Sequence, residues 1–90
     1  MDALDREIIA LIAKRVEYVR AAARFKPSAE AVVDHKRMET VLLSRRGWAE
    51  DAGLDGAAIQ AIYRDLVAYC VSEEQRFWSI SASHGADQVS

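Results

Sequence analysis

The first 25 residues carry an apolar stripe at helical spacing, and a basic residue interrupts it. The hydrophobic members recur in steps of three and four residues: Leu4, Ile8, Leu11, Tyr18 and Ala22. This period predicts an amphipathic helix from about Asp2 to about Phe25, ended by Pro27. Arg15 lies on the stripe, and Lys26 continues it about three turns later. Such cations are rarely buried unpaired, so this face, expected to form the core, predicts a bound anion from the protein or a ligand.

Two further helices follow from local signals in the sequence. The second is predicted over about 35–52, with Asp34 as its N-cap and Gly53 just after its end. Asp55 then caps a third helix over about 56–79. That helix has apolar residues on two adjacent lines, which indicates burial on more than one side. One line is Ile59, Ile62, Leu66 and Tyr69, and the other is Tyr63, Val67, Cys70 and Phe77.

The fold class expected from these helices is all-α, because no strand pattern or internal repeat is present. We predict one helical domain over residues 1–80 and a flexible C-terminal tail over 81–90, where periodicity is lost. Hydrophobic residues make up 51% of the 90-residue chain. That is more apolar surface than three helices of this length can cover alone, so we expect a homodimer.

Composition excludes several classes of partner and location. A net charge of −2, with acids and bases interspersed, argues against a nucleic-acid or anionic-membrane surface. No apolar run approaches the ~18 residues of a membrane span, and the acidic N-terminus does not resemble a signal peptide. With Cys70 as the only cysteine, an intrachain disulfide is impossible, and a cytoplasmic location is expected.

The candidate site residues are cations on or near inward-facing lines and a glutamate on the third helix. Arg37 opens the second helix, close in sequence to Lys26, whereas Arg45 is expected at the surface with its stem covering apolar area. Glu74 continues one apolar line of the third helix and Glu73 continues the other, so spacing does not choose between them. His35 and His84 have no partners at metal-ligand spacing, and no phosphate loop or activated nucleophile is present. The pattern favours a cation-lined pocket for a small polyanion, without metal or cofactor.

Four segments together resemble the all-helical (AroQ-type) chorismate mutase family, and within it the isochorismate pyruvate-lyase branch. They are LDREIIALIAKRVEYVRAAARFK, VVDHKRMETVL, WAEDAGLD and EEQRFW, and the resemblance covers about residues 2–78. It implies a three-helix protomer intertwined into a homodimeric bundle with shared active sites. It also implies a cofactor-free reaction on chorismate or isochorismate, giving prephenate in one case and salicylate with pyruvate in the other.

The resemblance assigns roles by position. Arg15 and Arg37 match arginines at the substrate carboxylates, and Lys26 matches a lysine on a carboxylate and the ether oxygen. Glu74 takes the place of a Gln or Glu that hydrogen-bonds the same ether oxygen. Two donors there would stabilise charge that grows as the C–O bond breaks. The full predicted substrate-contact set is Arg15, Lys26, Arg37, Met38, Cys70 and Glu74, with Lys26 and Glu74 catalytic.

Three positions depart from the family pattern. Met38 stands where typical mutases have Glu, which favours the lyase branch. Glu74, unlike Gln, can donate only when burial keeps it protonated. The family also has an arginine four residues before the position of Asp2, and the printed sequence lacks it.

Alternative functions remain open at this point. The chain could be chiefly a chorismate mutase of aromatic amino-acid biosynthesis, or a non-catalytic, dicarboxylate-binding or regulatory helical dimer. A third alternative is a plain helical interaction module, which predicts that Arg15 pairs with an internal carboxylate such as Glu73.

Overall fold

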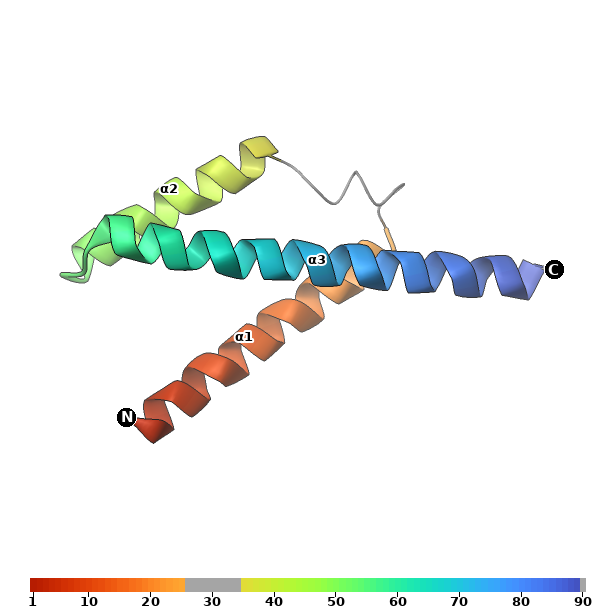
Figure 1. The fold of residues 1–90 in the computed structure, drawn as a ribbon, viewed down its shortest axis with the longest axis horizontal. Helices are drawn as coiled ribbons and strands as arrows, with labels where there is room; N and C mark the ends of the chain where they lie inside the picture. Colours follow the sequence, from red (N-terminus) through yellow and green to blue (C-terminus); the bar gives the residue numbers. More distant parts are fainter. Residues whose placement is uncertain (26–34, 90) are drawn as a thin grey trace. The chain divides into compact units, whose positions relative to one another are not determined.

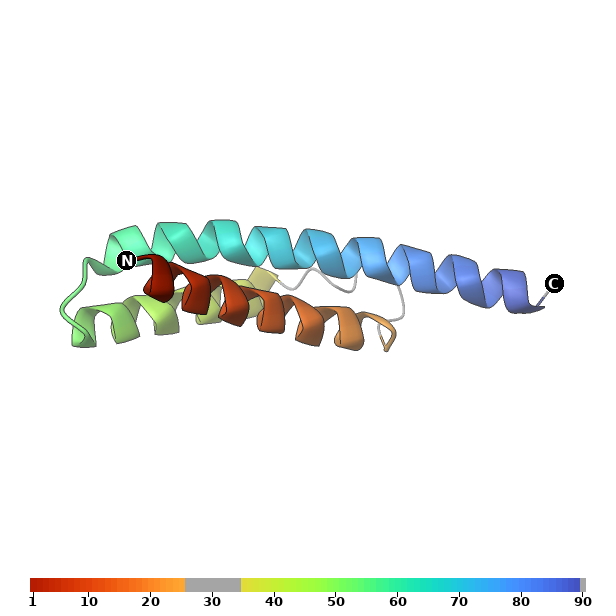
Figure 2. The same ribbon diagram turned by 90° about the horizontal axis from the view of Figure 1, so that it is seen from below.

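The computed structural model describes residues 1–25 and 35–89, with side chains as far as Ile80. The order of elements is α1 (Asp2–Ala23), α2 (His35–Asp51) and α3 (Gly56–Val89). Figures 1 and 2 show α3 as one uninterrupted helix. All regular structure within the described ranges is helical, which confirms the all-α, three-helix prediction.

The helices form two compact units, which are described separately. One unit combines α1 with the part of α3 that starts at Cys70. The other combines α2 with the part of α3 that ends at Tyr69. In the described parts of these helices, no segment is long and apolar enough to cross a membrane.

The turn between α2 and α3 is set by two residues that the sequence singled out. Gly53 has a φ of 81°, and its N–H donates to the Glu50 carbonyl at 3.0 Å. The N–H of Leu54 donates to the Ala49 carbonyl at 2.8 Å, which completes a Schellman motif. Asp55 Oδ1 accepts the Ala58 N–H at 3.1 Å and so caps α3. Both predicted helix signals are confirmed.

Two glycines allow a matched test of this turn. Gly53→Ala should lower the free energy of unfolding by about 1 kcal/mol, because a Cβ disfavours positive φ. Gly47→Ala is the control, since it lies within α2 and a Cβ there would meet nothing within 4 Å. That change should stabilise by about 0.5–1 kcal/mol. Urea unfolding of both variants checks the opposite signs, and a Gly53→Ala variant as stable as the wild type would contradict the strain.

Two expectations about the helices differ from the structure. The third helix was expected to end near residue 79 but continues to Val89; this segment contains no proline, and Gly85 does not end the helix. The expected flexible tail at 81–90 stays a prediction. The stripe on α1 was expected to form the core, yet within the single chain its large residues are exposed. The buried residues of α1 are Val16 and Ala23, about a quarter-turn around the helix from the stripe.

Candidate functional site

Arg15 lies half-buried on α1, directly before the buried Val16. Among the described residues, no hydrogen bond or ion pair is made by Arg15. A guanidinium is always charged and carries five donors, and partial burial without a partner costs free energy. Arg15 is therefore a cation without a protein partner in the described part of the chain, as the predicted anion site requires.

The inward face of α3 in the same unit carries Cys70 and Glu74, one helical turn apart. Cys70 is 2% exposed and Glu74 is 8% exposed, and Glu74 has polar contacts of its own. The question that spacing left open is thus decided, because Glu74 and not Glu73 continues the buried line from Val67. Cys70 is a free, buried thiol, as predicted.

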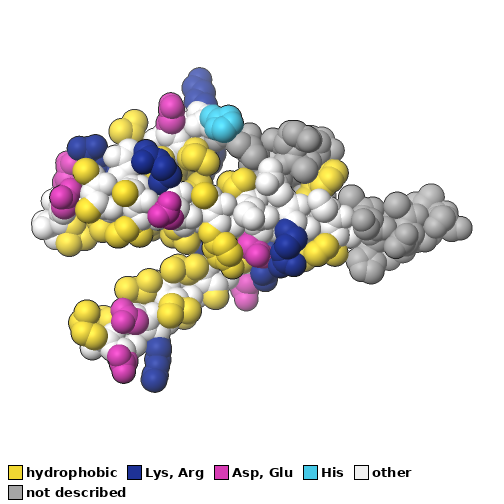
Figure 3. Space-filling model, in the orientation of Figure 1, with side chains coloured by type: hydrophobic (Ala, Val, Ile, Leu, Met, Phe, Trp, Pro, Cys, Tyr) yellow, Lys and Arg dark blue, Asp and Glu magenta, His cyan; other side chains and the backbone are white. Residues whose placement is uncertain are grey.

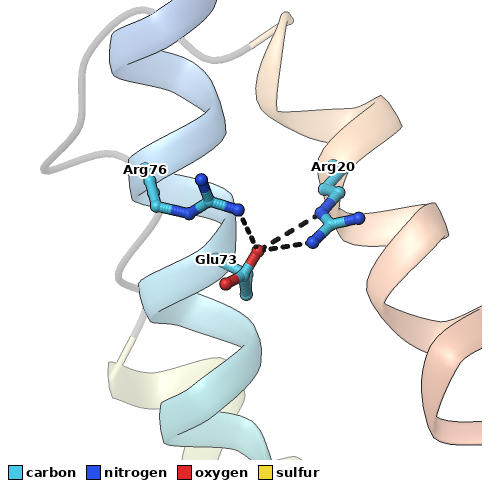
Figure 4. A network of polar contacts seen from close by, with 3 residues as sticks. All are labelled: Arg20, Glu73 and Arg76. Atoms are coloured by element: carbon cyan, nitrogen blue, oxygen red, sulfur yellow. Dashed lines mark hydrogen bonds and ion pairs between the residues drawn. The ribbon is translucent and has the colours of Figure 1, made fainter.

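Glu73 belongs to a different arrangement, in which two arginines share one carboxylate oxygen (Figure 4). Arg20 on α1 donates to Glu73 Oε2 from Nε at 3.3 Å and from Nη2 at 2.7 Å. Arg76, one turn further along α3, donates to the same oxygen from Nη2 at 2.9 Å. The interaction-module alternative predicted that Arg15 pairs with a carboxylate such as Glu73. The pairing of Arg15 with Glu73 is wrong, because Arg20 is the α1 residue that reaches this carboxylate.

The hydrogen bonds from Arg76 and Arg20 lower the pKa of the Glu73 carboxyl from its ordinary value of 4.5, and outweigh the partial burial that would raise it. A carboxyl whose pKa is lower in the folded state than in the unfolded state stabilises the fold at pH values above its pKa in the unfolded state. This stabilisation is lost as the pH falls through its pKa in the folded state.

Glu73→Gln should therefore be less stable than the wild type at about pH 7, and the difference should shrink as the pH falls below about 4.5. Urea unfolding at several pH values measures it. Glu50→Gln, which removes the exposed pair with Arg46 on α2, controls for loss of a surface carboxylate. A wild-type advantage that persists unchanged down to about pH 2 would contradict the ion-pair assignment.

The remaining predicted site residues lie elsewhere in the chain. Arg37 and Met38 are in the first turn of α2, in the other unit; Arg37 is exposed but has a polar contact, and Met38 is half-buried. Lys26 lies outside the described residues. Arg15, Cys70 and Glu74 thus lie in one unit, and their predicted roles are not tested by this arrangement. No group of three or more metal-ligating side chains occurs within the described part of the chain.

Sequence reasoning missed how Arg45 is held. Its guanidinium carbon lies 4.6 Å from the ring centroid of Trp48 and 5.8 Å from that of Tyr63. Nη1 donates to Ser44 Oγ at 2.9 Å, while the buried Nε has no partner among the described residues. The expected covering of apolar area by this side chain is present, but as cation–π stacking on two helices. The i to i+3 spacing of Arg45 and Trp48 was the signal available for it.

Comparison of the sequence with models of known protein families shows to which family the chain belongs. The model of chorismate mutase type II matches residues 1–75, which is most of the chain. The chain belongs to the chorismate mutase type II family. Family membership accounts for the all-helical fold and confirms the resemblance that the four segments carry.

One known relative extends the comparison beyond the family model. The chain is 31% identical to the isochorismate pyruvate lyase of Pseudomonas aeruginosa over 78 residues. The match spans 87% of this chain and 77% of the relative. Together with family membership, this supports an enzyme that acts on a chorismate-type small molecule.

Proposed function

We propose that the protein is an isochorismate pyruvate lyase that also has chorismate mutase activity. The observation that carries the proposal is Arg15, a half-buried cation with no anionic partner among the described residues. It lies in the same unit as the buried carboxyl of Glu74. A dicarboxylate substrate supplies the anion that Arg15 lacks, and a substrate ether oxygen supplies an acceptor for Glu74.

In the proposed reaction, Arg15 and Arg37 hold the two substrate carboxylates, because guanidinium groups match carboxylates in shape and charge. Lys26 and protonated Glu74 donate to the ether oxygen from two sides. As the C–O bond breaks, a ring hydrogen moves to the enolpyruvyl methylene carbon. Isochorismate thus yields salicylate and pyruvate with no atoms gained or lost. The residues supply orientation and charge stabilisation, and no covalent intermediate is needed.

Two features favour the lyase reaction over the mutase reaction as the main activity. The named relative is an isochorismate pyruvate lyase. Met38 is apolar and half-buried where typical mutases have a glutamate near the substrate's ring hydroxyl. Chorismate mutase activity is then the secondary reaction of the same pocket.

We also propose that the working form is a homodimer. The large residues of the α1 stripe are 54–69% exposed in the single chain: Leu4, Ile8, Leu11 and Tyr18. Figure 3 shows hydrophobic side chains along the surface of α1. An exposed apolar stripe this long is typical of a helix that packs against a partner. A second copy that covers it would also shield Arg15, which lies on the same stripe.

Turnover of both compounds tests the proposed function. Purified protein is incubated separately with isochorismate and with chorismate. Salicylate fluorescence measures the lyase reaction, and loss of chorismate absorbance measures the mutase reaction. Faster turnover of isochorismate is expected. Turnover of chorismate alone would replace the lyase by a mutase. Binding of malonate in a calorimeter without any turnover would indicate a non-catalytic dicarboxylate-binding dimer.

The protonation of Glu74 gives a separate prediction. Only the neutral carboxyl can donate to the ether oxygen, so the wild-type rate should decline as rising pH ionises Glu74. Glutamine donates at every pH, so Glu74→Gln should be active with a flatter pH profile. The measurement is kcat on isochorismate from about pH 5 to about pH 9. A profile that the substitution leaves unchanged would remove Glu74 from the reaction.

A further inference from the structure

Arg20 and Glu73 form an ion pair between two helices, α1 and α3. Two further pairs are local, Arg46–Glu50 within α2 and Glu73–Arg76 within α3. The contact from Arg20 spans 53 positions in sequence and uses two donors of one guanidinium. The Glu73 side chain is 15% exposed, which places this contact partly inside the unit. We call Arg20, Glu73 and Arg76 the α1–α3 clamp (Figure 4).

The clamp lies on the packed face of α1. Arg20 is four residues after Val16 and three before Ala23, and both of these are buried. On α3, Glu73 is three residues after the buried Cys70. The clamp is therefore part of the α1–α3 contact and not an isolated surface pair.

The fully buried part of this contact specifies its register weakly. Where the unit's side chains are described, the buried hydrophobic ones are small, Val16, Ala23 and Cys70, and larger ones such as Phe77 and Trp78 are half-buried. Small side chains offer little interlocking, so one helix can rotate or slide against the other at low cost. A two-donor arginine–carboxylate contact has a defined direction and length. It supplies the register that the small side chains do not.

Glu73, the carboxylate of the clamp, directly precedes Glu74, the proposed catalytic residue. Successive residues on an α-helix point about 100° apart, so a fixed direction for Glu73 also fixes the direction of Glu74. On the other helix, Arg15 is five residues before Arg20, a rise of about 7.5 Å. Rotation of α3 against α1 would therefore turn Glu74 relative to the helix that carries Arg15.

We propose that Glu73, held by Arg20 and Arg76, is a positioning residue that sets the direction of Glu74 toward the substrate. This inference rests on the proposed function, because it assumes that Glu74 acts on the substrate. Glu73 itself engages the two arginines and not the reacting atoms. It acts on the chemical step by orientation, where a misplacement of about 1 Å has a large effect on rate.

The test separates positioning from stability. Glu73→Gln removes the charge and keeps the side-chain size. We expect kcat on isochorismate to fall about tenfold while KM changes less than about threefold, at a temperature well below the melting point of each variant. The double substitution Arg20→Glu with Glu73→Arg should recover most of the loss, because Glu at position 20 can accept from arginines at positions 73 and 76. Glu50→Gln, which breaks the local pair in α2, should keep the wild-type kcat.

Each other outcome has a defined meaning. A lower melting temperature with unchanged kcat in Glu73→Gln would make the clamp merely structural and overturn the inference. If Glu73→Gln fails to fold, Arg20→Lys keeps the charge without the two-donor geometry and should show a smaller loss of kcat.

Backbone hydrogen exchange over residues 70–78 should quicken in the clamp variants and not in Glu50→Gln, and equal exchange would also overturn the inference. Inactive wild-type protein would instead refute the proposed function, and this is measured first.

Discussion

Arg15→Met is expected to lower kcat/KM on isochorismate by about 10²- to 10³-fold. Loss of one member of a partly buried, hydrogen-bonded charge pair costs about 2–5 kcal/mol, which converts to about 30- to 5,000-fold, and the expected loss lies in the middle of that range. The arginine has no internal partner among the described residues, so the lost interaction is the one with substrate. Steady-state kinetics on isochorismate measure the loss.

Stability should move differently from activity in this variant. An unpaired, half-buried charge is replaced by an apolar side chain of similar length, so the melting temperature should stay the same or rise. Lys14→Met is the matched control, because Lys14 is the adjacent cation of α1 and is exposed. It should keep wild-type kinetics. Arg15→Lys should also be impaired, since an ammonium cannot bind a carboxylate through two parallel donors. A near-normal rate in Arg15→Met would place this residue outside the site.

The parts of the fold that follow from short-range chemistry were predictable from the sequence. Gly53 and Asp55 fix the end of α2 and the start of α3 through hydrogen bonds within a few residues. Such signals act locally, so reading them needs no knowledge of tertiary contacts. The end of α3 was missed because residues 79–89 contain no proline, and neither Gly85 nor the loss of periodicity is enough to end the helix.

The candidate site could be predicted only in part, because it depends on contacts between helices that the spacing within one helix does not reveal. Glu73 and Glu74 each continue an apolar line, and only the position of Arg20 across the contact separates an ion-paired carboxylate from a buried one. The stacking of Arg45 could not be predicted for the same reason, because Tyr63 contacts it from another helix. Family resemblance supplied the proposed roles of Lys26 and Arg37, because spacing could not distinguish these residues from surface cations.

The stripe on α1 shows what a helical period leaves undecided. Spacing placed Arg15 and the apolar residues on one face, and that face is real. The single chain buries an adjacent face through Val16 and Ala23 and leaves the stripe exposed. The period of a helix reports that a face is apolar and does not say which chain covers it.

A single charge on the stripe should therefore separate the proposed homodimer into protomers. Leu11 is 67% exposed, and in a dimer its burial contributes about 1.5–3 kcal/mol from each copy. Leu11→Glu loses that contribution twice and places two carboxylates in an apolar contact. We expect the dissociation constant to rise by more than about 10³-fold, so that the variant is monomeric at micromolar concentration.

Light scattering after size-exclusion chromatography measures this change, and activity should fall with the dimer because each site is proposed to draw on both copies. Ala13→Glu adds the same charge at an exposed position of α1 on the side opposite the stripe, and it should remain dimeric and active. A Leu11→Glu protein that stays dimeric at wild-type activity would show that the stripe is not the interface. A monomeric wild type with full activity would go further, because Arg15 would then bind its substrate without a second chain to shield it.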